Sequence, residues 1–303
     1  MRFGDRFGEE EGNMYECKYG ILPDGRVLVD YGPVTMSILA EQAGKAAIEA
    51  AAAGAREALR QLDILIPSLS LARRRIPDLS EEMLKDCPEI LRRMAEAVRR
   101  LDRDDFTPMA AVAGTFSEMV RDHILAATKA DTVVVNNGGD IALGSKDEKK
   151  EWSVGIISDL NRRDVTHRLK LPGGDQSAGL ATSGFGGRSL SKGIASAVTV
   201  IAEKPSWADA AATDIANATY VEDPQVVRCL AEELEYGTDI RGDLVVKEVG
   251  PLGGAVIDQA LRQGTGRARE LVRAGVIRGA VLFLGGKTAR YPMEKAAFEL
   301  TEI

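Results

Sequence analysis

Three short stretches of the sequence combine residue types that could bind an anion or a metal ion. The first is TVVVNNGGD, which ends in Asn136, Asn137, Gly138, Gly139 and Asp140. Asparagines and glycines after a run of β-branched residues are typical of a tight turn at the end of a strand. Because glycine has no side chain, such a turn also lets a ligand come close to the main chain. The pattern predicts a turn and leaves a ligand site open as an alternative.

The second stretch, WADAAAT, places Asp209 and Thr213 four residues apart, on one face of a predicted helix with only alanines between them. A carboxylate and a hydroxyl can bind Mg²⁺, which prefers oxygen ligands and completes its shell with water or phosphate. Ser206 lies three residues before Asp209, which is also the spacing of a helix N-cap and its partner. Spacing alone favours the helix cap, and the metal site remains the alternative.

The third stretch, GFGGRSLSK, supplies two cations, Arg188 and Lys192, and two serines. This combination suits phosphate but is as common on solvated turns. It is not a dinucleotide-binding fingerprint, because no G-x-G-x-x-G register fits it. The GGKT stretch at residues 285–288 is not a P-loop either, because Val281 stands where that motif requires its first glycine.

Charge and cysteine content argue against several classes of protein. Acidic residues outnumber basic ones by 46 to 39 and the pI is near 5.2, which is unfavourable for binding nucleic acid or an anionic membrane. Cys17, Cys87 and Cys229 are too scattered for a disulfide framework, and His123 and His167 do not cluster with them as zinc ligands would. The charged first eleven residues and the lack of a long apolar stretch predict a cytoplasmic protein.

Periodicity and turn signals predict the elements that would position these residues. Alternating runs within residues 1–31 predict a small antiparallel ladder, and the alanine-rich residues 36–64 predict a long helix. Further helices are expected at residues 80–101, from about 108 onward, and at 206–217, 224–234 and 254–274. Strands are expected at residues 132–135, 152–157, 179–182 and 194–202, and in the apolar run AVLFLGG. Helices and strands are therefore interleaved along the chain.

Taken in order, NNGGD, W-x-VGI, ATSG, the strand SAVTVIA and WADAAAT resemble the core of the ApbE-like superfamily, named for flavin transferases that attach FMN from FAD to proteins. In that superfamily these motifs surround the flavin nucleotide, and the last one supplies Mg²⁺ ligands. The resemblance implies that FAD or a related nucleotide contacts Asn136, Gly138, Gly139, Asp140, Thr182, Ser183 and Gly184. It also implies that Asp209, as the catalytic residue, and Thr213 hold Mg²⁺, with Arg188 and Lys192 as further cations at the nucleotide.

The resemblance covers residues 109–219, about a third of the chain, and this stretch departs from the transferase pattern twice. Ala113, Gly114 and Thr115 stand where the transferases carry lysine, glycine and tyrosine. The interval FGGRSLSKGIA lacks the histidine and the D-P-x-T-G loop that transferases carry between the T-S-G and S-V-T-V strands. The departures affect pieces that position the substrate, whereas the metal-helix pattern is retained.

The resemblance implies one α+β domain with an ApbE-like, T-fold-related arrangement, in which mixed or antiparallel sheets pack against long helices. Its expected parts are strands and long helices in residues 1–107, the motif-bearing core in 108–237 and a helix-strand extension in 238–303. The chain is similar to a cytoplasmic branch found largely in archaea and anaerobic bacteria, whose members are suspected of a part in sulfur assimilation towards homocysteine. Two functions follow from the resemblance: a Mg²⁺-dependent transferase that uses FAD, or an accessory protein for sulfur delivery. A homo-oligomer and a sulfur-pathway partner stay open.

Overall fold

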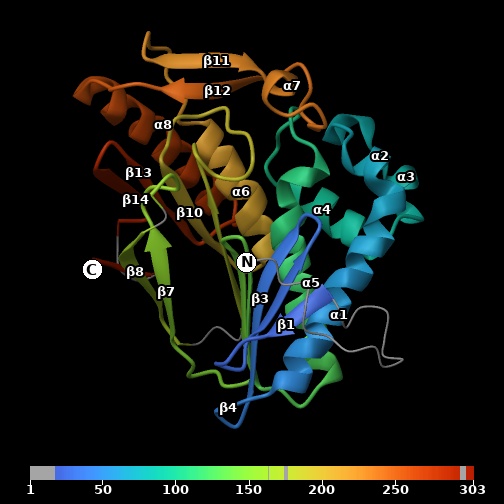
Figure 1. The fold of residues 1–303 in the computed structure, drawn as a ribbon. Coiled ribbons are helices and arrows are strands. Elements are labelled where there is room, and N and C mark those ends of the chain that lie inside the picture. Colours follow the sequence, from blue (N-terminus) through green and yellow to red (C-terminus); the bar gives the residue numbers. More distant parts are fainter. Residues whose placement is uncertain (1–17, 163, 174–176, 294–297) are drawn as a thin grey trace.

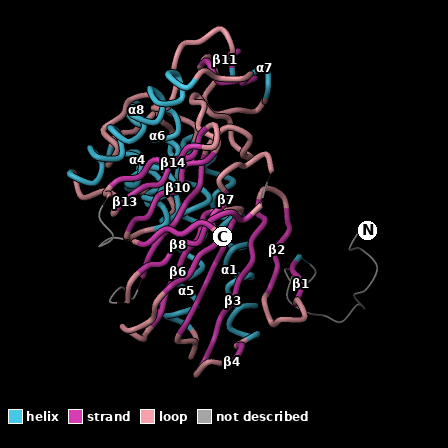
Figure 2. Tube along the Cα trace, turned by 90° about the vertical axis from the view of Figure 1, so that its left-hand side faces the viewer, coloured by secondary structure: helices cyan, strands magenta, loops and turns pink. Residues whose placement is uncertain are grey.

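The computed structural model describes residues 18–162, 164–173, 177–293 and 298–303. Within these residues the centre of the molecule is a ten-stranded antiparallel sheet (Figures 1 and 2). Its strands lie in the order β1-β2-β3-β5-β6-β9-β10-β13-β14, and β4 pairs with β3. Their bounds are β1 Tyr19–Ile21, β2 Val27–Tyr31, β3 Val34–Gln42, β4 Lys45–Ala46, β5 Thr132–Asn137, β6 Asp140–Ser145, β9 Ser177–Ser183, β10 Ala197–Ala202, β13 Gly279–Leu284 and β14 Lys287–Tyr291.

Long helices cover one face of this sheet (Figure 1). In sheet order they are α1 Ile48–Leu65, α5 Val112–Ala127, α6 Pro205–Asn217 and α8 Gly254–Arg273. Ala51, Ala55 and Ala58 form a fully buried stripe on α1, and a Cβ at Gly54 would lie 2.5 Å from Ile124 of α5. Small residues therefore allow α1 and α5 to pack closely. The shorter helical segments are η2 Ile66–Ser68, α2 Leu69–Ala72, η3 Ile76–Asp78, α3 Glu81–Lys85, α4 Glu89–Arg99 and η4 Pro108–Ala111.

The opposite face of the large sheet is covered by a small sheet in the order β15-β8-β7. Trp152, Leu169 and Phe298 pack there against Leu180 and Phe283 of the large sheet. Because both faces are covered, β10 and β13 are buried along their whole length, and Thr199 is the one polar residue in these two strands. In Figure 1, β7 and β8 stand on the side of the sheet away from α1 and α5. The bounds of the small sheet are β7 Trp152–Ile157, β8 Val165–Leu171 and β15 Glu299–Glu302.

A separate two-stranded sheet lies above α6 in Figure 1. It consists of β11 Val226–Leu230 and β12 Leu244–Val249, joined through the short helix α7 Ala231–Leu234. We call these three elements the ribbon. The main-chain N–H of Val246 donates to the carbonyl of Ser191 at 2.8 Å. The ribbon is therefore attached to the long loop between β9 and β10.

The loops that carry the NNGGD, TSG and GFGGRSLSK motifs all lie at one end of the large sheet. Because neighbouring strands run antiparallel, every second connection returns at the same end of the sheet. Residues 31–34, 137–140, 183–197 and 284–287 join β2 to β3, β5 to β6, β9 to β10 and β13 to β14 at this end. The NNGGD turn, the TSG stretch and the GFGGRSLSK loop are therefore neighbours in space.

Three predictions of secondary structure were wrong. The helix expected over residues 36–64 begins only at Ile48, because Met36, Ile38 and Ala40 are buried alternately along β3. The helix expected over 80–101 is two helices, α3 and α4, separated at Pro88. The helix expected over 224–234 is mostly β11, followed by the short α7.

Other expectations were confirmed or fall outside the described part. The α+β class is confirmed, as are the helices at α5, α6 and α8. Of the predicted N-terminal ladder, β1 and β2 pair as expected, and residues 1–17 lie outside the described residues. Across the part of the chain that the structure describes, no helix is both long and apolar enough to cross a membrane.

Candidate functional site

The turn between β5 and β6 consists of Gly138 and Gly139, whose φ angles are +69° and +114°. Asn137 pairs with Asp140 across its base, and Asn136 Oδ1 accepts the N–H of Gly139 at 2.9 Å. Only glycine adopts positive φ angles at both positions without strain. The NNGGD pattern thus specifies a two-residue hairpin turn whose outer surface carries no side chain.

The N-terminal half of α5 lies beside this hairpin. Ser117 Oγ donates to the carbonyl of Asp140 at 2.8 Å, and Asp209 of α6 accepts the N–H of Gly114 at 2.8 Å. A Cβ at Gly114 would lie 2.4 Å from the carbonyl oxygen of Pro205, so glycine is what allows α5 and α6 to come this close. Asp209 therefore caps the positive N-terminal end of α5 from a neighbouring helix.

The prediction that Ser206 and Asp209 cap α6 itself was wrong. Helix α6 begins at Pro205 with Lys204 as its N-cap residue, and no side chain caps it. Ser206 Oγ instead donates to Glu118 Oε2 at 2.6 Å. The proline at the first position of the helix has no N–H to satisfy, so the helix can start there without a Ser206 cap.

Two carboxyl groups with perturbed pKa values meet between the turn and α6. Burial raises the pKa of Asp209 to about 7, even though the N–H groups of Gly114 and Ala113 favour its charged form. Burial, and then the charge of Asp209, raise the pKa of Asp140 well above its ordinary value, and Arg188 offsets this only in part. The two carboxylates therefore repel each other when both are ionised. A cation held between them would relieve that repulsion.

A cavity of about 780 Å³ opens beside the hairpin; we call it the turn cavity. One wall is polar and comes from the hairpin, the end of β9 and the loop that follows. The opposite wall is apolar and comes from α1, the segment after it, and α5. The polar wall includes Asn137, Gly138, Asp140, Thr182, Ser183, Gly184, Gly187, Arg188 and Ser189; the apolar wall includes Leu62, Leu65, Ile66, Leu69, Val112 and Phe116.

Arg188 lies directly against the hairpin turn. A Cβ at Gly138 would lie 1.8 Å from Arg188 Nη2, so the guanidinium occupies the space that a side chain would fill. Within the described residues, Arg188 makes no hydrogen bond and no ion pair, although its charge acts on the Asp140 carboxyl and favours the ionised form. Arg73, at the end of α2, also lines the cavity and has no side-chain partner among those residues. The turn cavity thus contains two cations that are available to an anionic ligand.

The turn cavity brings together most of the residues that the sequence singled out. Those that line it are Gly138, Asp140, Thr182, Ser183, Gly184 and Arg188. Asn136 and Gly139 belong to the hairpin but do not line the cavity, and Thr182 Oγ1 also lies 2.9 Å from Thr199 Oγ1. Lys192 is elsewhere: its ammonium group pairs with Asp105 and Asp243.

Neither Asp209 nor Thr213 lines the turn cavity. Asp209 is linked to the cavity through the first turn of α5 and through its effect on Asp140. Thr213 is half-buried one turn further along α6, and its hydroxyl has no hydrogen-bond partner in the described part of the chain. No cluster of three or more His, Cys, Asp or Glu side chains among the described residues could hold a metal ion. Asp140 and Asp209 do lie close enough to affect each other, and two carboxylates with water and phosphate are oxygen ligands of the kind that Mg²⁺ prefers.

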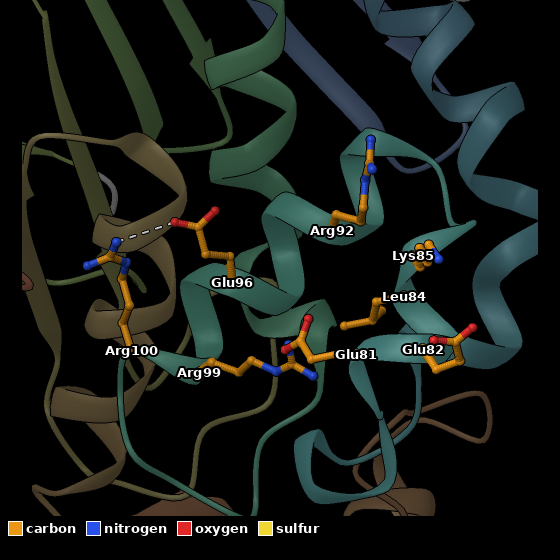
Figure 3. A pocket seen from close by; sticks show the side chains of 8 residues that line it. All are labelled: Glu81, Glu82, Leu84, Lys85, Arg92, Glu96, Arg99 and Arg100. Atoms are coloured by element: carbon orange, nitrogen blue, oxygen red, sulfur yellow. Dashed lines mark hydrogen bonds and ion pairs between the residues drawn. The ribbon is translucent and has the colours of Figure 1, made fainter.

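A groove of similar size, about 700 Å³, lies on α3 and α4, away from the hairpin (Figure 3). We call it the α4 groove. Its lining is charged, and several charges neutralise one another: Arg99 pairs with Glu81, and Arg100 pairs with Glu96 at 3.4 Å. Arg100 also lies over the ring of Trp207 at 3.8 Å. The α4 groove therefore resembles an ordinary solvated surface.

The apolar wall of the turn cavity had no signal in the sequence. Leu62, Leu65, Ile66 and Leu69 read as the core face and end of a long helix, and they are more than sixty residues from the hairpin. Arg73 belongs to an arginine-rich connector with no distinctive spacing. Only the packing of α1 against α5 places these residues opposite Arg188.

The hairpin and the end of β9 line one cavity, and β10 and α6 follow them along the chain in the order of the motifs on which the ApbE-like resemblance was recognised. The family model described as "AbpE bacteria" matches residues 20–290, most of the chain, and the chain belongs to this family. The resemblance is therefore confirmed at the level of the family. It extends well beyond the motif-bearing third on which it was recognised.

Among curated proteins, the chain is similar to UPF0280 proteins. It is 36% identical over 164 residues to one from Methanopyrus kandleri, covering 54% of this chain and 61% of that protein. It is 33% identical over 174 residues to one from Methanobrevibacter smithii, covering 56% of this chain and 70% of that protein. The chain thus spans about three fifths of the length of the first of these relatives.

Among solved structures, the flavinyl transferase ApbE of Pseudomonas stutzeri, in its apo form, matches at 15% identity with a TM-score of 0.37, covering 64% of this chain and 50% of that one.

Proposed function

We propose that the turn cavity binds FAD or a related flavin nucleotide together with Mg²⁺. The observation that carries this proposal is the exposed guanidinium of Arg188, which packs on a turn without side chains and lines one cavity together with apolar side chains. Membership of the "AbpE bacteria" family supports it. A ligand that suits such a cavity has an anionic phosphate part and a flat apolar ring system, which flavin nucleotides combine.

In this proposal the phosphates lie at the polar wall. Arg188 donates to phosphate oxygens, and Gly138 lets the main chain of the hairpin approach them closely. Asn136 keeps the turn in shape through its bond to Gly139. Thr182, Ser183 and Gly184 line the same wall and offer hydroxyl and main-chain groups. The ring system lies against the apolar wall.

Asp209 and Thr213 would hold the ion, with Asp140 beside them. Mg²⁺, when bound, supplies positive charge to phosphate oxygens. The residues of this chain act around it: Asp209 stays anchored to α5 through Gly114, and Arg188 adds a second positive charge on the cavity side. We propose Asp209 as the residue on which any reaction depends.

A transferase reaction would use the same arrangement. An acceptor hydroxyl would form a bond to the FMN phosphorus while the phosphoanhydride bond breaks and AMP leaves with its electron pair. The proton of the hydroxyl would pass to solvent or to a carboxylate at the polar wall. Binding without this reaction would instead fit the accessory role in sulfur assimilation.

The test is a titration of the purified protein with FAD, with and without Mg²⁺, followed by flavin fluorescence and by release of AMP. We expect Mg²⁺-dependent binding that Arg188→Ala weakens and that Arg92→Ala, in the α4 groove, leaves unchanged. Binding with AMP release on addition of an acceptor supports the transferase; binding without release supports the accessory role. No FAD binding at high protein concentration would overturn the proposal.

The compartment and the partners belong to the same proposal. Cys87 and Cys229 are both free thiols, which suits a reducing compartment such as the cytoplasm. The proposed small-molecule partner is a flavin nucleotide. A homo-oligomer or a partner from sulfur metabolism would be detected by native mass spectrometry of the purified protein, which would also identify any ligand that co-purifies.

A further inference from the structure

Lys192 has a structural setting that the sequence did not suggest. Its Nζ lies 2.8 Å from Asp243 Oδ2, at the start of β12, and donates to Asp105 Oδ2 at 2.6 Å. Its main-chain N–H donates to Asn217 Oδ1 at 2.9 Å. Lys192 is therefore fixed at both its main chain and its side chain, and it does not line the turn cavity.

Asp243 also binds a second cation from another part of the chain. Arg75 Nη2 donates to Asp243 Oδ1 at 2.7 Å, and the same guanidinium donates to the carbonyl of Asp105. The side chains of Arg75, Asp243 and Lys192 are only 25%, 20% and 18% exposed. Burial acts to raise the pKa of Asp243, but the hydrogen bonds from Lys192 and Arg75 outweigh it and keep the pKa below its usual value. These pairs are shielded from water, so they constrain the chain more than pairs on an open surface.

Both cations that bind Asp243 are close in sequence to cations that line the turn cavity. Arg75 comes two residues after Arg73, and Lys192 comes four residues after Arg188. Arg73 and Arg188 are the two cations on the cavity lining, and neither makes a side-chain hydrogen bond or ion pair with another described residue. One carboxylate on the ribbon thus ties together the two segments that carry these cations.

From this geometry we infer that Asp243 is a positioning residue for ligand binding: it sets the separation of the Arg73 segment and the Arg188 loop, and so the length of anion that the cavity accepts. The inference rests on the proposed binding of a nucleotide. Without the carboxylate, Arg75 and Lys192 would face each other with only the more exposed Asp105 nearby. Their repulsion would move the loop and shift Arg188 away from the hairpin.

The first experiment compares FAD binding by Asp243→Asn, Asp243→Glu and Asp258→Asn. Asp258 is a matched control, because it pairs with Lys287 at 2.6 Å on the surface, away from the turn cavity. We expect Asp243→Asn to weaken FAD binding about tenfold, Asp243→Glu to recover most of that loss, and Asp258→Asn to bind as the wild type does. Equal affinity of Asp243→Asn and the wild type would overturn the inference.

A double-mutant cycle with Arg188→Ala asks whether Asp243 acts through Arg188. If it does, Asp243→Asn has a much smaller effect on FAD affinity in the Arg188→Ala background than in the wild type. Fully additive effects would show that Asp243 stabilises the protein in general, and would count against positioning.

Amide hydrogen exchange separates this inference from the proposed function, because it needs no ligand. Faster exchange in residues 184–193 and 69–76 of Asp243→Asn, with unchanged exchange in β5, supports positioning even if the wild type fails to bind FAD. Unchanged exchange in both segments overturns it. If Asp243→Asn does not fold, Lys192→Gln removes one arm of the same contact, and we then expect faster exchange in residues 184–193 alone.

Discussion

The turn cavity and the α4 groove have similar volumes, about 780 and 700 Å³, but opposite chemistry. In the α4 groove, arginines and glutamates neutralise one another, as Figure 3 shows for Arg100 and Glu96. In the turn cavity, Arg188 has no hydrogen-bond or ion-pair partner among the described residues; its charge acts on Asp140, and apolar side chains line the same cavity. Size alone therefore does not distinguish a binding site from a surface hollow.

The two regions differ in whether their charged groups have partners within the protein. Burying charged groups without partners costs free energy, so folds retain them where a ligand completes them. The carboxyl pair of Asp140 and Asp209 is in that position, because burial raises the pKa of both groups. Paired and solvated charges, such as those of the α4 groove, contribute little to stability and need no ligand. The predictions below test this contrast.

Asp209→Asn is expected to have the largest effect. Asparagine can still accept the N–H of Gly114, so the cap of α5 is largely kept, whereas the negative charge for Mg²⁺ is lost. We expect Mg²⁺-dependent FAD affinity to fall roughly 100-fold, measured by fluorescence titration at fixed Mg²⁺. Glu82→Gln in the α4 groove is the control and should bind as the wild type does. Similar losses in both variants would remove the contrast between the two regions.

Gly138→Ala and Gly139→Ala form a matched pair within the hairpin. Both positions have positive φ angles, so alanine strains the backbone by about 1 kcal/mol or more at each. Only at Gly138 would the new Cβ collide with Arg188; at Gly139 nothing lies within 4 Å. Thermal denaturation should show similar destabilisation of both, while FAD affinity falls about tenfold more in Gly138→Ala. Equal affinities would mean that Arg188 does not bind the ligand from this position.

The pH dependence of stability tests the carboxyl pair. The pKa of Asp209 is 3.8 in an unperturbed chain and about 7 in the fold, so between these values the native state binds more protons than the unfolded state. Stability is therefore fully present below about pH 4 and is lost as pH rises towards 7, by about 1.4 kcal/mol per pH unit at most for this group. Denaturant unfolding without metal should show this fall, and Asp209→Asn should flatten it. Mg²⁺ should stabilise the protein more at pH 8 than at pH 5; the reverse order would contradict an ion at this pair.

The parts of the site that could be predicted from the sequence depend on local chemistry. The hairpin follows from two adjacent glycines after β-branched residues, and α6 follows from an alanine-rich run behind a proline. Spacing was enough to place Asp209 and Thr213 on one face of that helix. It was not enough to find the helix that Asp209 caps, because α5 lies almost a hundred residues earlier in the chain.

The parts that could not be predicted depend on contacts between distant segments. Residues 36–42 have helix-forming alanines nearby, but the sheet needs a strand between β2 and β5, and this overrides local propensity. Lys192 has the charge of a phosphate ligand, yet Asp105 and Asp243 determine its direction. The apolar wall also requires α1 to pack on α5. The hydrophobic pattern of neither helix reveals that a cavity remains between this wall and the polar wall.

The smallest expected effect is that of substitutions in this apolar wall, which test whether the wall contacts the ligand. Ile66 is 51% exposed and lines the turn cavity, whereas Ile21 is 58% exposed at the edge of the sheet and does not. Serine at either position removes a similar apolar surface and should change the unfolding free energy little. If ligand rings cover Ile66, Ile66→Ser weakens FAD binding by about threefold, equivalent to roughly one lost methylene contact, and Ile21→Ser has no effect. Binding that is insensitive to Ile66 but still dependent on Arg188 would place the rings outside the apolar wall, and would restrict the site to the phosphate part of the nucleotide.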